Sequence, residues 1–257
     1  MQRGNVLLSI SGPICRTTNL TCTFFLLHQI RDTIVQDANN SEGTGSWANI
    51  QAVESHVPAP SLTTSHYLRI ASSQIDQTAA VSSSIDDNAP AALRCTEPER
   101  AEILRHLGHA VYLSTLMCFV HGLDVMEREN EKGKWGIKIP RELEIWKKQD
   151  ASSSPMLSQR ACKRHMPKDL MYDVYLLCKP QIAGEVKRHR PSLKKIVLQG
   201  IEHDAHVPCL SATLEYLKYI GGTNLSSSFT EAQLNCFGAH GNDLRSEPVR
   251  HLMKGKC

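Results

Sequence analysis

A Gly-Thr-Gly segment early in the chain is the first candidate for chemistry. It lies within SEGTGSW, residues 41–47. Glycines let backbone N–H groups approach a phosphate closely, and the threonine hydroxyl adds one more donor. A phosphate-binding glycine loop normally follows a strand and opens a helix, whereas this segment follows a predicted helix and has Glu42 beside it. The local pattern alone therefore favours a plain turn.

Two further side chains could bind an anion, and each has an ordinary alternative role. Arg69 falls late in a predicted helix, where a single arginine usually is solvated or pairs with the helix dipole. His240 lies in FGAHGND, just after a predicted helix end, where a histidine is usually a surface residue. Neither residue indicates a site by itself.

The composition is that of a globular protein. The chain has 257 residues, of which 41% are apolar and 21% charged, with a formal net charge of +3. This balance favours neither disorder nor a nucleic-acid partner. The nine cysteines are odd in number, widely spaced and without a C-x-x-C pair, which indicates a reducing compartment and predicts a cytoplasmic protein. We find no signal peptide and no run of about 18 apolar residues, so we expect no membrane association.

The apolar residues recur at spacings of three and four, which predicts an all-α fold. Thr96 and Glu99 form a capping-box pattern that opens a long helix ending near Gly133. Its middle, residues 110–120, is apolar nearly all round, which predicts burial in a bundle or at a subunit interface, and hence a dimer. A second capping box, Ser228 with Glu231, opens a short helix that Gly238 ends.

The other predicted elements are also helical. We expect an exposed connection over residues 82–95, and Pro191 at the first position of its helix. The predicted helices cover residues 24–37, 61–75, 141–148, 167–178, 180–189 and 191–206.

Several segments, taken in order, resemble the C-terminal helical domain of 6-phosphogluconate dehydrogenase. They are IRDTIVQDANNSEGTGSW, VPAPSLTTSHYLRIAS, HAVYLSTLMCFVHGLDVMEREN followed by WGIKIPRELEIW, PSLKKIVLQGIEHDAHVPCLSATLEYL and TEAQLNCFGAH. The resemblance covers roughly residues 24–250 with gaps. It implies an uncertain segment at 1–23, the helical domain at 24–240 and a tail at 241–257. Variable connections are expected at about 76–98 and 148–166.

The resemblance implies a chemistry for these residues. Enzymes of this family oxidise the 3-hydroxyl of 6-phosphogluconate with NADP, release carbon dioxide and protonate the enediol to give ribulose 5-phosphate, a step of the pentose phosphate pathway. A doubly charged phosphate needs amides, a hydroxyl and a guanidinium converging on it. By resemblance, Gly43 and Thr44 supply the loop contacts, Arg69 supplies the bidentate cation, and His240 of the partner subunit completes the site.

The chain also departs from the family pattern. No G-x-G-x-x-G turn and no K-x-x-H-N-G-x-E-Y motif is found, so we expect no catalytic residue and no NADP bound by this chain alone. The family's arginine six residues before the FGAH histidine is Leu234 here. Loss of that charge-assisted hydrogen bond should weaken phosphate binding on the order of tenfold to a hundredfold. The family's IWRGGC-type segment has become IWKKQDASSS, residues 145–154.

Three interpretations remain open at this stage. The chain is the helical domain of a 6-phosphogluconate dehydrogenase, whose activity belongs to a larger protein that also has a dinucleotide domain. Alternatively, it is a non-enzymatic helical module that forms a homodimer or pairs with an intact paralogue, as the exchange to Leu234 favours. An unrelated helical scaffold is the third. In each case we expect the purified chain not to reduce NADP with 6-phosphogluconate.

Overall fold

The computed structural model describes residues 43–85, 93–139, 141–142, 176–223 and 225–238. In this described part the secondary structure is entirely helical, which confirms the predicted all-α class. The elements are α3 (Gly43–Glu54), α4 (Pro60–Ser73), α5 (Ile75–Ser84), α6 (Glu97–Gly133), the 3₁₀ turn η1 (Leu176–Cys178), α9 (Pro180–Glu202), α10 (Pro208–Ile220) and α11 (Ser227–Gly238). The chain divides into two compact units, residues 1–214 and 215–257, which are described separately below.

Helix α6 begins and ends where the sequence predicts. The backbone N–H of Thr96 donates to a carboxylate oxygen of Glu99 at 2.8 Å, and its hydroxyl donates to the same oxygen at 2.9 Å. This capping box satisfies groups that a helix N-terminus leaves without partners. At the other end Lys134 takes a left-handed conformation with φ of 51°, which ends the helix after Gly133.

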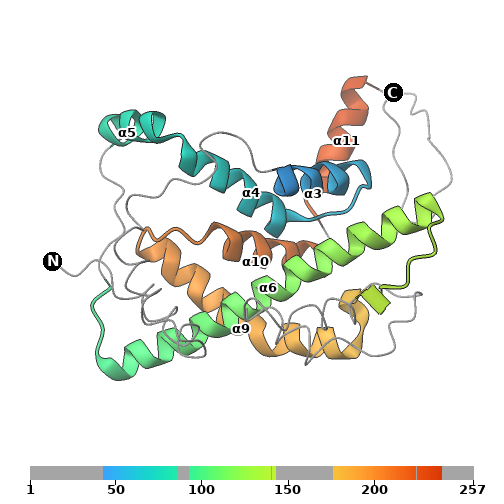
Figure 1. Ribbon diagram of the computed structural model, residues 1–257. Helices are drawn as coiled ribbons and strands as arrows, with labels where there is room; N and C mark the ends of the chain where they lie inside the picture. Colours follow the sequence, from blue (N-terminus) through green and yellow to red (C-terminus); the bar gives the residue numbers. More distant parts are fainter. Residues whose placement is uncertain (1–42, 86–92, 140, 143–175, 224, 239–257) are drawn as a thin grey trace. The chain divides into compact units, whose positions relative to one another are not determined.

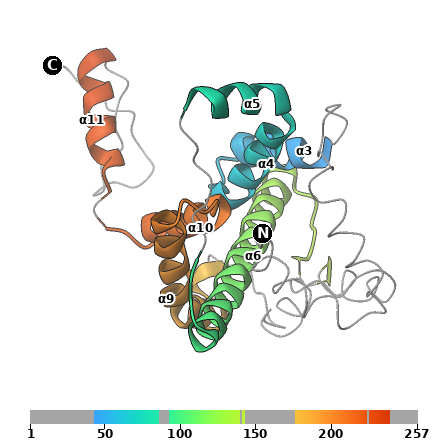
Figure 2. The same cartoon turned by 90° about the vertical axis from the view of Figure 1, so that its left-hand side faces the viewer.

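Helices α6 and α9 lie side by side and form the core of the first unit (Figure 1, Figure 2). None of residues 110–120 is exposed, as the all-round apolar pattern predicted. The fully buried side chains include Leu113, Leu116, Met117 and Leu193. Among the described helices, α6 alone is long and apolar enough to cross a membrane, a test that core helices also pass. Its packing against α9 and its buried polar residues, Ser114 and His121, favour a core helix.

Helix α9 corrects one prediction. We expected two helices, at 180–189 and 191–206, with Pro191 opening the second, but a single helix runs from Pro180 to Glu202 with Pro191 inside it. A proline inside a helix costs about 3 kcal/mol, because it removes one hydrogen bond and crowds the preceding turn. The buried face continues across the proline through His189, Ser192 and Leu193, and Pro191 itself is exposed. Packing against α6 therefore outweighs the local cost.

The N-terminal helices of the first unit correct two further predictions. The Gly-Thr-Gly segment is not a turn, because α3 begins at Gly43 and includes all three residues. The helix predicted at 61–75 is α4, which starts one residue earlier with Pro60 in its first turn. Residues 75–84, mostly assigned to a variable connection, form α5, whose alanines and glutamine favour a helix even though none of its residues is buried.

A chain of buried hydroxyl groups joins three helices of the first unit. Thr213 Oγ1 lies 2.9 Å from Ser61 Oγ on α4 and 2.7 Å from Ser114 Oγ on α6, and it donates to the carbonyl of Cys209 at 2.8 Å. Each hydroxyl can donate once and accept twice, so the chain satisfies these groups without water. It fixes the first turn of α4 to the middle of α6.

The second unit includes the last turns of α10 and the whole of α11. The hydroxyls of Tyr219 and Ser226 lie 3.1 Å apart across the connection between these helices. The predicted capping box of Ser228 and Glu231 is wrong, because it requires Ser228 to precede the helix. Helix α11 begins at Ser227, so Ser228 lies inside the first turn. The helix ends at Gly238, as predicted. The predictions for residues 24–37, 148–166, 167–175 and 239–257 lie outside the described residues.

Candidate functional site

The first turn of α3 carries the two predicted backbone contacts, Gly43 and Thr44. As first and second residues of the helix, they have N–H groups without acceptors inside the helix. The helix dipole adds partial positive charge at this end, which favours an anion. The sequence assigned these residues to a turn, but a helix N-terminus provides the same donors in a fixed direction.

His66 of α4 lies against this turn. Its Nε2 is 3.3 Å from Ser46 Oγ, and a Cβ placed on Gly45 would lie 2.7 Å from its Nδ1. Only glycine therefore fits at position 45 without moving the ring. Sequence analysis missed His66, although its spacing of three residues from Arg69 places both on one face of α4.

Arg69, the predicted cation, follows His66 by about one helical turn. The residue is half-buried, and its Nε and Nη2 atoms are shielded from solvent. A solvated arginine, the alternative considered from sequence, would expose these atoms. Because α3 packs against α4, the structure brings the helix that carries Gly43 and Thr44 against the helix that carries Arg69 (Figure 1).

The fourth predicted contact, His240, lies outside the described residues. Leu234, which stands where the family has an arginine, is on α11 in the second unit with 46% of its surface exposed. Three of the four residues predicted to contact the phosphate, Gly43, Thr44 and Arg69, therefore lie within the described part of the chain. Whether they share one ligand with His240 stays a prediction.

Three buried groups on α6 have strongly shifted pKa values. Burial lowers the pKa of His121 to about 4 and raises that of the Cys118 thiol to about 11. Burial, with Glu127 nearby, raises the pKa of Asp124 to about 7. Loss of hydration disfavours the charged form of each group. At neutral pH His121 and Cys118 are therefore neutral, and Cys118 is a poor nucleophile.

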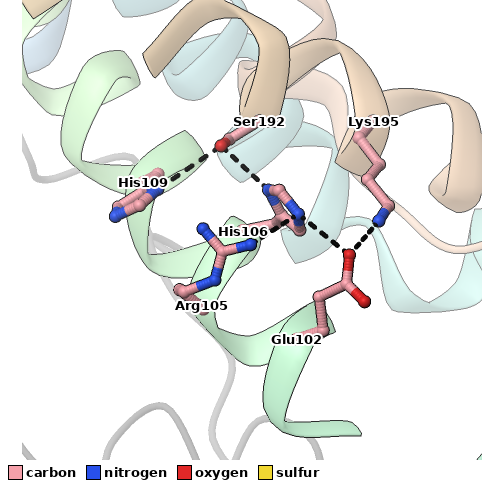
Figure 3. Close-up of polar contacts among 6 residues, drawn as sticks. All are labelled: Glu102, Arg105, His106, His109, Ser192 and Lys195. Carbon is pink, nitrogen blue, oxygen red and sulfur yellow. Dashed lines mark hydrogen bonds and ion pairs between the residues drawn. The ribbon is translucent and has the colours of Figure 1, made fainter. Parts of the chain in front are cut away.

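A polar cluster lies where α6 meets α9 (Figure 3). Ser192 Oγ is 2.9 Å from His106 Nδ1, and His106 Nε2 is 3.3 Å from Glu102 Oε1. A serine, a histidine and a carboxylate in line are the groups of a hydrolase triad. Ser192, however, is only 5% exposed, and a nucleophile must reach its substrate. We therefore assign this cluster to the joint between the helices.

The described residues hold no cluster of three or more histidine, cysteine or acidic side chains suited to a metal ion. They also lack the strand, glycine turn and helix that bind a dinucleotide.

Comparison with known proteins identifies the class of this helical domain. The family described as 6-phosphogluconate dehydrogenase, C-terminal domain, matches residues 3–253, and the chain belongs to this family. The match covers residues 3–23 as well, beyond the segments that carried the sequence resemblance.

Its relatives are decarboxylating 6-phosphogluconate dehydrogenases. The protein of that name from Emericella nidulans is 36% identical over 228 residues, covering 87% of this chain and 45% of the relative. The one from Staphylococcus aureus strain N315 is 24% identical over 245 residues, covering 91% of this chain and 47% of the relative. This chain thus spans about half the length of these relatives.

A solved structure shows the same fold. The 6-phosphogluconate dehydrogenase of Plasmodium falciparum superposes with a TM-score of 0.71 at 19% identity, covering 95% of this chain and 54% of that one. At this identity the likeness concerns the fold.

Proposed function

We propose that this chain is the substrate-binding helical domain of a decarboxylating 6-phosphogluconate dehydrogenase. In this proposal the first turn of α3 and Arg69 of α4 bind the phosphate of 6-phosphogluconate. The observation that carries it is the position of Gly43 and Thr44 at a helix N-terminus packed against α4. Membership of the family supplies the substrate class.

The two helices provide complementary contributions to phosphate binding. The N–H groups of Gly43 and Thr44 and the threonine hydroxyl are neutral donors, and the helix dipole adds to them. The guanidinium of Arg69 adds a permanent positive charge that favours the phosphate anion. His66 supports the α3 turn from the α4 side through its contact with Ser46.

The redox chemistry requires a part that the described residues do not provide. The Plasmodium falciparum structure is described in complex with its cofactor NADP+. NADP would accept the hydride from the 3-hydroxyl, and the described residues lack the strand, glycine turn and helix that bind a dinucleotide. We expect the chain alone to bind substrate phosphate without turnover.

Two further properties belong to the same proposal. We propose a dimer on the ground of family membership, because α9 of the same chain already packs on the apolar middle of α6. A reducing, cytoplasmic compartment is consistent with the five described cysteines, all of which are free thiols. A non-enzymatic module that pairs with an intact paralogue is less well supported, because the relatives compared above are all named as dehydrogenases.

The test compares 6-phosphogluconate with gluconate, which lacks only the phosphate. A ligand that binds the native state raises the unfolding temperature by an amount set by its concentration relative to its Kd. Because Leu234 should weaken binding, millimolar ligand is appropriate. We expect a shift with 6-phosphogluconate, a much smaller one with gluconate, and loss of the difference in Arg69→Ala.

The matched control is Arg190→Ala, which removes an exposed arginine from α9. It should leave the ligand-induced shift unchanged. Equal shifts with both ligands, or a full shift in Arg69→Ala, would contradict the proposed phosphate site.

A further inference from the structure

The polar cluster between α6 and α9 contains an unusual number of histidines for a helix interface. His106 and His109 lie on α6 and His189 lies on α9, all within one stretch of the same contact. We propose that this interface is a proton-sensitive joint: it is closed while His109 and His189 are neutral, and it loosens when they are protonated.

One nitrogen of His106 lies near both a hydrogen-bond donor and an acceptor, and it cannot bond to both at once. Its Nε2 lies 3.1 Å from Arg105 Nη2 and 3.3 Å from Glu102 Oε1 (Figure 3). A guanidinium can only donate a hydrogen bond, whereas an ionised carboxylate can only accept one. A ring whose Nε2 carries no proton accepts from Arg105, whereas a ring with a proton on Nε2 donates to Glu102. The partner of His106 therefore depends on whether Nε2 carries a proton.

Ser192 links His106 to His109. His106 Nδ1–H can donate to Ser192 Oγ, 2.9 Å away, which leaves the serine hydroxyl to donate to His109 Nδ1 at 3.4 Å. This arrangement needs a neutral His109. Burial, and then the charges of Arg105 and His106, hold the pKa of His109 below its usual range. Within the described residues, no carboxylate lies at ion-pair distance from His109 to offset these effects.

His189 faces His109 from the other helix. The two ring centroids lie 4.7 Å apart, and the ring of Tyr112 is 5.0 Å from that of His189. His189 Nε2 lies 3.2 Å from Glu185 Oε2, but its buried Nδ1 has no hydrogen-bond partner in the described part of the chain. Protonation would thus create a buried N–H without an acceptor, which is costly. Burial lowers the pKa of His189, although Glu185 opposes that effect.

The fixed charges around these rings already favour the neutral state. Three permanent cations, Arg105, Arg188 and Lys195, face two carboxylates, Glu102 and Glu185. The joint therefore carries excess positive charge before either ring is protonated. Two imidazolium rings at 4.7 Å would add repulsion to that excess. The other groups facing the rings are His106 and Tyr112.

The sign of the pH effect follows from linkage. The pKa values of His109 and His189 are lower in the folded chain than the usual 6.5, so the unfolded chain binds more protons below that pH. The contribution of these two rings to the free energy of unfolding is therefore fully present above about pH 6.5. It falls as the pH drops toward their lowered pKa values. His121, with a pKa lowered to about 4, contributes a loss of the same sign.

The first experiment measures unfolding temperature from about pH 7.5 to about pH 5.5. The double variant His109→Gln/His189→Gln keeps polar side chains but cannot be protonated. On acidification we expect the double variant to retain clearly more stability than the wild-type chain. His121 and Asp124 act with opposite signs over this range, since the pKa of Asp124 is raised to about 7, but both are present in both chains and leave the difference unchanged. His206→Gln, which changes an exposed histidine, should follow the wild type. Identical pH dependence in the wild type and the double variant would overturn the proposal.

A second measurement uses the wild-type chain, so it does not depend on whether the double variant folds. Imidazole NMR signals of the wild-type chain, titrated over the same range, should include two rings besides His121 that protonate below the usual value. The single variants His109→Gln and His189→Gln assign them. Ordinary titration of both rings would overturn the proposal, whatever the behaviour of the double variant.

Discussion

The pair α6–α9 is packed much more heavily than the pair α3–α4, to which we assign the proposed phosphate site. Along α6, residues 110–120 are all buried or half-buried, whereas α3 and α4 each bury a single residue, Ala52 and Ser61. Trp47 and Val53 of α3 are mostly exposed. A phosphate must reach backbone N–H groups, which a dry core prevents. The proposed anion site accordingly lies on the lightly packed pair, and α6 of the heavily packed pair holds that pair in place.

Polar groups serve different purposes in the two pairs. Between α6 and α9 they form a connected cluster whose charges respond to protons. Around α3 and α4 they attach these helices to α6: Ser55 donates to Glu129 at 2.6 Å, and Ser61 joins the hydroxyl chain through Thr213. These attachments join the α3–α4 pair to α6.

The largest expected effect is in the α6–α9 core. Leu193→Ala removes a side chain that is 0% exposed, and it should lower the free energy of unfolding by about 2–5 kcal/mol through lost burial and a cavity. Denaturant unfolding measures this change. Leu198→Ala, on the same helix but 50% exposed, is the matched control and should cost much less. Similar losses at both positions would mean that α9 does not pack as described.

A smaller effect is expected where the two pairs are joined. Thr213→Val keeps the shape of the side chain but leaves the buried hydroxyls of Ser61 and Ser114 without their shared partner. The expected cost is about 1–3 kcal/mol in unfolding free energy. Thr78→Val on exposed α5 removes a hydroxyl that only bonds within its own helix and should be nearly neutral.

Displacement of α4 should also weaken the proposed phosphate site. In Thr213→Val the stabilisation by 6-phosphogluconate should fall, whereas Leu193→Ala should leave it largely intact wherever the variant remains folded. An unchanged ligand effect in Thr213→Val would show that the hydroxyl chain supports stability but does not position Arg69.

The heavily packed pair was also the more predictable one. Helix α6 was predicted from Thr96, Glu99 and an apolar pattern, all of which are local signals, and its observed bounds agree. Pro191 misled the prediction for α9, because a local breaker competes there with tertiary packing that one sequence does not reveal. For the same reason the contact between His106 and Ser192 could not be predicted, since the two residues lie 86 positions apart in the sequence.

The site was only partly predictable. Gly43, Thr44 and Arg69 were found through family resemblance, and the structure places their helices together, but the segment at Gly43 proved to be helical. Glycines lower helix propensity, so a local interpretation of Gly-Thr-Gly favours a turn. His66 had no signal of its own, because its role depends on the contact with Gly45 across two helices.

The smallest expected change in stability concerns the contact between Gly45 and His66. It is tested by comparing glycine-to-alanine substitutions at Gly45 and at Gly108. Gly108→Ala lies in α6 with open space around the added Cβ, so it should stabilise the chain by about 0.5–1 kcal/mol through helix propensity. Gly45→Ala gains the same propensity, but its Cβ would lie 2.7 Å from His66 Nδ1 and must displace the ring. The two terms nearly cancel, so we expect little net change in unfolding temperature.

The ligand response separates the two substitutions. If His66 holds the first turn of α3, Gly45→Ala should reduce the stabilisation by 6-phosphogluconate several-fold, and Gly108→Ala should leave it unchanged. Alternatively, Gly45→Ala could stabilise the chain as Gly108→Ala does and keep the full ligand effect. That outcome would mean that the His66 ring moves away from the added Cβ at no measurable cost. The α3 turn would then be held by its own helix alone, and the lightly packed pair would need no support from His66.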